Sequence, residues 1–156
     1  MTATLKEDGT VELTIEREFN YPPQQIFEAW LDPQKLAIWM GPSDEIQAEA
    51  VKVNAVEGGA YSMQFNNEDG SALSLHGVYK TIQRYTLLVF TWIWEPAMDT
   101  ANSETLVSVE FIPTDTGTRL RLVHQRFGSE DIRDRHHSGW EGTLDKLMRR
   151  IDLVLA

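Results

Sequence analysis

The sequence predicts an α+β protein in which a curved antiparallel sheet wraps around a long C-terminal helix. Segments between residues 11 and 127 alternate apolar and polar side chains with the period of two that is typical of half-buried strands. Residues 140–155 carry a single apolar stripe at helical spacing, wide enough to pack on a sheet. One helix covers a seven-stranded sheet only if the sheet curls around it, and twisted sheets do so.

The 156 residues fit a single domain. Residues 1–9 are polar and lack the apolar core of a signal peptide, so we expect a flexible N-terminal tail. Residues 10–156 are then expected to form the folded domain.

The first strand is predicted at residues 11–19, where the alternation is strict. Two prolines at residues 22–23 stop it, and proline is tolerated in the first turn of a helix, so a short helix is predicted next. Asp32 is an N-cap candidate followed by Pro33 at the first helical position, which predicts a second short helix ending near Gly41.

Six further strands are predicted between residues 46 and 127. The alternation of the first slips near Ala50, which indicates a bulge. Residues 87–94 are apolar on both faces, as in a central strand. The last two strands, within residues 104–127, form a predicted hairpin with its turn at Asp115-Thr116-Gly117.

The C-terminal helix is predicted to present one apolar face to the sheet. At about 100° per residue, its apolar side chains fall within an arc of roughly 120°. They are Trp140, Leu144, Leu147, Met148, Ile151, Val154 and Leu155. Ser129 is a plausible N-cap for an earlier start, and His136 then lies one turn before Trp140, on the flank of the apolar face.

Composition excludes several classes of partner. The formal net charge of −10 argues against DNA, RNA and anionic membranes, which bind basic surfaces. No apolar run approaches the roughly 20 residues of a membrane span, so no membrane insertion is expected. The chain has no cysteine, which rules out disulfides, thiolate nucleophiles and zinc–sulfur sites and fits a cytoplasmic location. We expect a monomer or a homodimer.

A cavity between sheet and helix is the expected binding site. Its predicted lining comes from inward-facing side chains of both: Trp39, Met63, Phe65, Leu75, Tyr79, Phe90, Trp92, Trp94, Leu122, His124, Trp140, Leu144 and Met148. Apolar pockets carry a few placed polar groups. The possible polar anchors here are Arg17, His124 and His136.

Each anchor has a second interpretation. His124 shares a strand face with Leu120 and Leu122, so it is either a hydrogen-bonded core histidine or a contact for a ligand hydroxyl or carbonyl. Arg17 faces inward and needs a partner, either an acidic side chain of the protein or a ligand carboxylate.

No catalytic residue, metal or cofactor is predicted. The adjacent His136 and His137 lack the i, i+4 spacing of a metal pair. No Ser-His-Asp set and no carboxylate cluster of the metal-binding kind can be read from the spacing.

Short motifs follow one another along nearly the whole chain. They are Arg17-Glu18-Phe19, Pro22, Phe27-Glu28-Ala29-Trp30, Asp32-Pro33, Leu36, Trp39, Gly58-Gly59, Gly77-Val78-Tyr79, Leu88-Val89-Phe90-Thr91-Trp92, Thr118-Arg119-Leu120 and Gly139-Trp140. In this order they resemble the START-like, or SRPBCC, superfamily with its helix-grip (Bet v-like) fold. Within it, the chain is similar to the family of homologues of the activator of heat-shock protein 90 ATPase.

The resemblance implies a START-like ligand-binding domain over residues 10–156, with a deep pocket for lipid-like, aromatic or polyketide-like molecules. We therefore expect binding of an apolar small molecule, with no chemistry required. Two alternatives remain. One is a cyclase- or dehydratase-like enzyme with His124 or His136 as its acid–base group. The other is a chaperone-associated interaction module, which a large exposed apolar patch would favour.

Overall fold

The computed structural model describes residues 11–97 and 103–156, so the expected tail at residues 1–9 lies outside the described residues. The strands are β1 (Val11–Phe19), β2 (Ala48–Val53), β3 (Ala60–Asn66), β4 (Ala72–Gln83), β5 (Leu87–Glu95), β6 (Glu104–Pro113) and β7 (Thr118–Phe127). The helices are α1 (Pro23–Ala29), α2 (Pro33–Trp39), α3 (Glu130–Arg149) and α4 (Ile151–Leu155).

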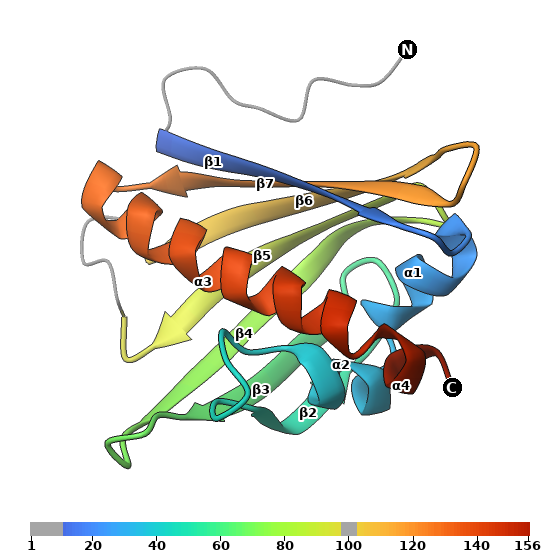
Figure 1. Ribbon diagram of the computed structural model, residues 1–156. Helices are drawn as coiled ribbons and strands as arrows, with labels where there is room; N and C mark the ends of the chain where they lie inside the picture. Colours follow the sequence, from blue (N-terminus) through green and yellow to red (C-terminus); the bar gives the residue numbers. More distant parts are fainter. Residues whose placement is uncertain (1–10, 98–102) are drawn as a thin grey trace.

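The strands form one antiparallel sheet in the order β1-β7-β6-β5-β4-β3-β2. Figure 1 shows the sheet curving around α3, which crosses its concave face, with α1, α2 and α4 grouped near one end of α3. This arrangement confirms the predicted α+β helix-grip fold. Among the described residues no helix combines the length and the apolar character that a membrane crossing requires.

Local side-chain chemistry sets several element boundaries. The Asp32 carboxylate accepts a hydrogen bond from the Gln34 backbone N–H at 2.9 Å, and the Ser129 hydroxyl accepts one from Ile132 at 3.2 Å. Both side chains satisfy N–H groups that a helix leaves unpaired, as predicted for N-caps. The bulge predicted at Ala50 is confirmed, because this residue has a φ of 51° and the β2–β3 register shifts around it.

The central strand β5 buries one face more than the other. Leu88, Phe90 and Trp92 point into the core, whereas Val89 and Ile93 on the opposite face stay partly exposed. The strand lies in the middle of the order β1-β7-β6-β5-β4-β3-β2, so the predicted central position is confirmed. Its less buried face points away from the helices of the described residues, which lie on the concave side of the sheet (Figure 1).

The single C-terminal helix predicted up to Leu155 is interrupted. Arg150, with φ −102° and ψ 12°, leaves helical geometry between α3 and α4. Its guanidinium donates to the Ile38 carbonyl at 2.8 Å and to the Asp44 carboxylate at 3.2 Å. These contacts tie Arg150 to the chain segment around α2, and α4 packs there in a new direction.

The buried face of α3 is rotated relative to the predicted stripe. Thr143 and Lys146 are buried, whereas Met148 is 40% exposed. At about 100° per residue, Thr143 and Lys146 lie on one side of Trp140 and Met148 lies on the other. The loop between α2 and β2 covers the Lys146 side, so the prediction that Met148 faces the cavity is wrong.

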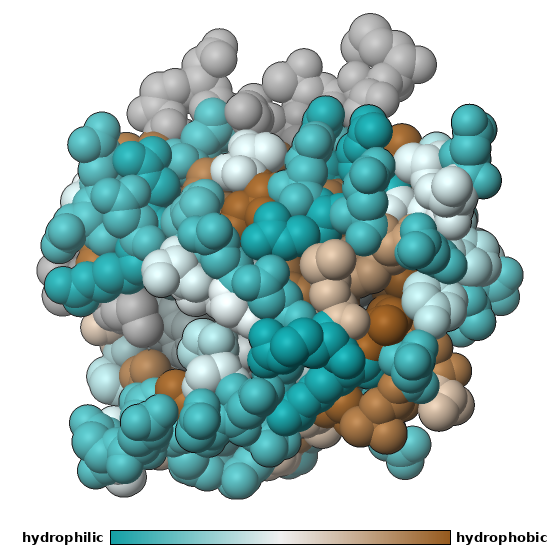
Figure 2. All heavy atoms as spheres, in the orientation of Figure 1, coloured by the Kyte–Doolittle hydropathy of each residue, from teal (hydrophilic) through white to brown (hydrophobic). Residues whose placement is uncertain are grey.

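Figure 2 shows that the face carrying α3 is largely hydrophilic, with apolar atoms gathered towards the end of the molecule where α4 lies. Leu153 in α4 contributes to the exposed apolar surface, with an exposed fraction of 62%.

Candidate functional site

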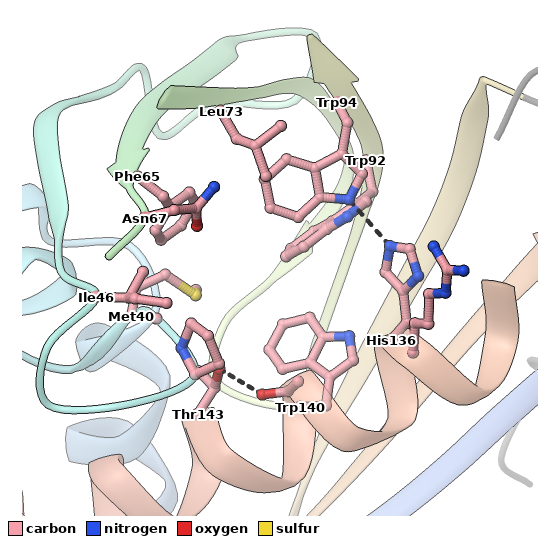
Figure 3. Close-up of a pocket in the computed structure, with 14 residues that line it drawn as sticks. Met40, Ile46, Phe65, Asn67, Leu73, Trp92, Trp94, His136, Trp140 and Thr143 are labelled. Carbon is pink, nitrogen blue, oxygen red and sulfur yellow. Dashed lines mark hydrogen bonds between the residues drawn. The ribbon is translucent and has the colours of Figure 1, made fainter. Parts of the chain in front are cut away.

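A pocket of about 340 Å³ lies between α3, strands β3–β5 and the loop that joins α2 to β2. Its lining residues come from all of these elements: Met40, Gly41, Pro42, Ile46, Phe65, Asn67, Leu73, Trp92, Trp94, Arg135, His136, Gly139, Trp140 and Thr143. Figure 3 shows the pocket with the strand residues on one side and the helix residues on the other.

The wall of the pocket is aromatic. Period-two alternation puts Trp92 and Trp94 on the same face of β5, with ring centroids 5.5 Å apart. Trp140 approaches Trp92 from α3 at 5.0 Å, and Phe65 of β3 lies 5.7 Å from Trp94. These rings give the pocket a stiff, apolar surface that suits stacking against a planar molecule.

His124 lies behind this wall and is fully buried. The Trp140 indole donates to its Nδ1 at 3.0 Å, so we assign the ring proton to Nε2, which donates to the Thr105 hydroxyl at 2.7 Å. Thr105 in turn donates to the Trp92 carbonyl at 3.2 Å. Burial holds the pKa of His124 well below its usual range, and the nearby His136 lowers it further. The ring is a neutral support for Trp140.

His136 is held from two sides. Its Nδ1 lies 2.9 Å from the Ile132 carbonyl, which only accepts hydrogen bonds, so Nδ1 carries a proton. The Nε2 atom accepts a hydrogen bond from the Trp94 indole at 2.9 Å (Figure 3). Both ring nitrogens of His136 therefore have hydrogen-bond partners inside the domain.

The loop between α2 and β2 forms a side wall of the pocket and is fixed to α3. The buried Lys146 ammonium donates to the carbonyls of Ser43 at 3.0 Å and Ile46 at 3.2 Å. Burial is the main reason why the pKa of Lys146 is lowered. Arg149 pairs with Asp44 of the same loop at 2.9 Å. The wall therefore depends on contacts from the C-terminal half of α3.

Some predicted lining residues are in the pocket and others are not. Phe65, Trp92, Trp94 and Trp140 line it, together with the predicted anchor His136. Met63, Leu75, Tyr79 and Phe90 instead surround a second space of about 20 Å³, with Trp30 and Leu36 packed against them. That space has room for about one water molecule.

The remaining predicted residues serve the packing of the domain. Trp39, Leu122 and Leu144 are fully buried and absent from the pocket lining, and Met148 is exposed. Arg17 lies 3.5 Å from Asp145 of α3, which corresponds to the ion-pair interpretation of this anchor.

Sequence reasoning missed the other lining residues, from the loop, the strands and α3: Met40, Gly41, Pro42, Ile46, Asn67, Leu73, Arg135, Gly139 and Thr143. Gly139 offered a signal, because glycine inside a helix is unfavourable and often marks a special position. An ideal Cβ built on it meets no atom within 4 Å, so this position faces open space. No comparable pattern marked the loop.

Within residues 11–97 and 103–156, no group of three or more His, Cys, Asp or Glu side chains is arranged to hold a metal ion. The pocket chemistry of the described residues consists of rings, aliphatic groups, a few hydrogen-bonding atoms and the guanidinium of Arg135.

A family model described as Activator of Hsp90 ATPase homolog 1-like protein matches residues 20–152. An AHSA1 protein from Silicibacter pomeroyi has a similar structure, with 26% identity and a TM-score of 0.79 over 92% of this chain and 99% of that one. A protein from Chromobacterium violaceum follows at 22% identity and a TM-score of 0.78, covering 88% of this chain and 95% of that one. An AHSA1-like protein from Aeromonas hydrophila has 21% identity and a TM-score of 0.74, and the match covers 94% of this chain and 96% of that one. No curated protein sequence matches the chain.

Proposed function

Since the chain belongs to the family described as Activator of Hsp90 ATPase homolog 1-like protein, a family of helix-grip domains that bind ligands, we propose that residues 10–156 bind an apolar small molecule between α3 and the sheet. The ligand is aromatic or polyketide-like. It occupies the space bounded by Phe65, Trp92, Trp94 and Trp140.

The size and lining of the pocket carry this proposal. Ligand pockets commonly measure about 300–1,000 Å³ and are mostly apolar, and this one measures about 340 Å³. Ring faces favour planar ligands over flexible chains, because stacking adds attraction beyond simple burial. A lipid chain would also lose more conformational freedom on binding.

The proposed binding site can be tested by filling the pocket with a larger side chain at position 139. A leucine here projects into open space, so Gly139→Leu should fill the pocket without displacing the core. Isothermal titration of the neutral probe 2-(2-naphthyl)ethanol should show binding to the wild type and at least a tenfold weaker affinity for Gly139→Leu. Leu122, another predicted lining residue, is unsuitable for this test. It is fully buried outside the pocket, so a larger side chain there would overpack the core.

Gly139→Ala is the matched control, because it removes the same glycine and adds a single methyl group. It should bind the probe with an affinity close to that of the wild type. Equal affinity of the wild type and Gly139→Leu, or no binding by the wild type, would count against the proposed site.

A further inference from the structure

Resting on the proposed binding function, we propose that the pocket prefers aromatic ligands with a carboxylate or similar anionic group at their outer end, and that Arg135 is the residue that contacts this group. The ligand class is thus an amphipathic aromatic acid. Its ring system stacks inside the pocket, and its charge stays at the mouth.

The sign of the charge on the pocket lining supports this preference. The chain has 24 acidic and 14 basic side chains, yet the described residues that line the pocket include Arg135 and no acidic side chain. The exposed surface of an acidic protein repels anions in general, so a basic group at the pocket is a local exception. A guanidinium matches a carboxylate in geometry, because two parallel N–H groups contact both oxygens.

Arg135 is available for such a contact. Its side chain is 65% exposed, and its ion pair with Asp131 one turn earlier is long at 3.6 Å, with Asp131 83% exposed. Exposed pairs of this kind contribute little to stability. Exchange of Asp131 for a ligand carboxylate therefore costs little, and Asp131 does not itself line the pocket.

The deeper wall gives a reason for the charge to stay outside. The Trp140 indole donates to His124. The Trp94 indole donates to His136, and the Thr143 hydroxyl donates to the Gly139 carbonyl at 2.7 Å (Figure 3). These groups are already paired within the protein, so a ligand charge placed among them would be desolvated without compensation.

A ligand cation is the main alternative to an anion at the outer end of the pocket. Aromatic walls attract cations as well as planar rings, but a ligand cation near Arg135 meets like charge. An anion or a neutral acceptor is consequently favoured over an ammonium group.

The experiment compares three probes that share a naphthalene ring and differ in their terminal group: 2-naphthylacetate, 2-(2-naphthyl)ethanol and 2-(2-naphthyl)ethylamine. Isothermal titration at pH 7.5 and low salt should rank the affinities acid above alcohol above amine. The contribution of an exposed charge pair predicts a preference for the acid over the alcohol of about three- to fivefold. The preference should shrink as NaCl is added.

Arg135→Gln should bring the acid and the alcohol to equal affinity, since glutamine keeps the helix propensity and removes the charge. Arg119→Gln is the matched control. Arg119 lies on β7 and pairs with Glu18 at 3.4 Å, and it does not line the pocket. The control should keep the full preference for the acid.

The outcomes separate the two proposals. If none of the probes binds the wild type, the proposed function fails and this inference fails with it. If the alcohol binds but the acid binds no tighter, or if Arg135→Gln leaves the preference unchanged, the anion preference is overturned while the binding function stands. Tightest binding of the amine would identify a cation site and also overturn it.

Discussion

His124 shows how a single polar residue can organise an aromatic wall. Both of its ring nitrogens are bonded inside the core, to Trp140 and to Thr105. The ring fixes the position of the Trp140 indole only while it stays neutral, because a proton on Nδ1 would remove the acceptor that Trp140 uses.

The stability of the protein should therefore depend on pH through His124. The unfolded chain binds this proton near pH 6.5 and the folded chain does not, so protonation favours the unfolded state. The contribution is fully present above pH 6.5 and is lost as the pH falls below it, by at most about 1.4 kcal/mol per pH unit. Urea unfolding between pH 8 and pH 5 should show this loss, and His124→Gln should lack it.

An independent measurement guards against a variant that does not fold. In wild-type protein at pH 5.5, the NMR shifts of the His124 ring should be those of the neutral form. A ring that titrates near pH 6.5 in the folded protein would contradict the assignment.

Lys146 holds the side wall of the pocket. Lys146→Met keeps the apolar stem but leaves the Ser43 and Ile46 carbonyls without their donor. The free energy of unfolding should fall by about 1–3 kcal/mol, the cost of unpaired buried groups. Probe affinity should fall as well, because the loop that carries Ile46 loosens.

Lys35→Met provides the comparison for Lys146→Met. Lys35 donates to the Val154 carbonyl at 2.7 Å, which lies away from the pocket. This variant should lose stability and keep the affinity of the wild type. An equal loss of affinity in both variants would show that the loop contact has no particular link to the pocket.

At the scale of elements, α3 contains two glycines with opposite surroundings. A Cβ at Gly139 meets open space, whereas a Cβ at Gly142 would lie 2.2 Å from the Pro42 carbonyl oxygen. Gly142 thus permits the close approach of the α2–β2 loop to the helix, and Gly139 leaves part of the pocket unfilled.

The two alanine substitutions should consequently change stability in opposite directions. Gly139→Ala should stabilise the protein by about 0.5–1 kcal/mol, because glycine is costly inside a helix. Gly142→Ala gains the same helix propensity but forces the loop backbone to move, with a net loss of about 1–3 kcal/mol. The melting temperatures of both variants, measured beside that of the wild type, test these opposite changes in stability. A gain in stability for Gly142→Ala would contradict the close packing of the loop.

Element boundaries that depend on local signals could be predicted from the sequence. The N-caps Asp32 and Ser129 and the hairpin within residues 104–127 were recognised because the necessary side chains lie next to the structure they determine. The break in the helix at Arg150 could not be predicted, since it depends on contacts with Ile38 and Asp44 about a hundred residues earlier. The burial of Lys146 depends on distant carbonyls in the same way.

At the scale of the whole molecule, the space between sheet and helix has two unequal parts. Trp30, directly after α1, and Leu36 of α2 fill one part and reduce it to about 20 Å³. The part beside Trp94 and His136 remains as the pocket of about 340 Å³. Period-two alternation predicted that Phe65, Tyr79 and Phe90 all face inward. It contains no information on which of them the short helices would cover.

A ligand in the pocket should stabilise the whole domain by mass action. At a free concentration of about 100 times the dissociation constant, 2-(2-naphthyl)ethanol should add about 2.7 kcal/mol to the free energy of unfolding. For a domain of this size, each kcal/mol raises the melting temperature by roughly 2–4 °C. Differential scanning calorimetry should show this rise for Gly139→Ala but not for Gly139→Leu. Equal rises in both variants would mean that the probe binds elsewhere.

The bulge at Ala50 also affects how one molecule meets another. Strand β2 is an edge of the open sheet, and the unpaired backbone groups of an edge can recruit a strand from a second chain. In β2 the positive φ of Ala50 and the register shift between Glu49 and Lys52 interrupt the regular row of donors and acceptors after a few residues. Both flanking charges are exposed. An incoming strand finds no continuous partner along this edge, so the bulge opposes aggregation through sheet extension at β2.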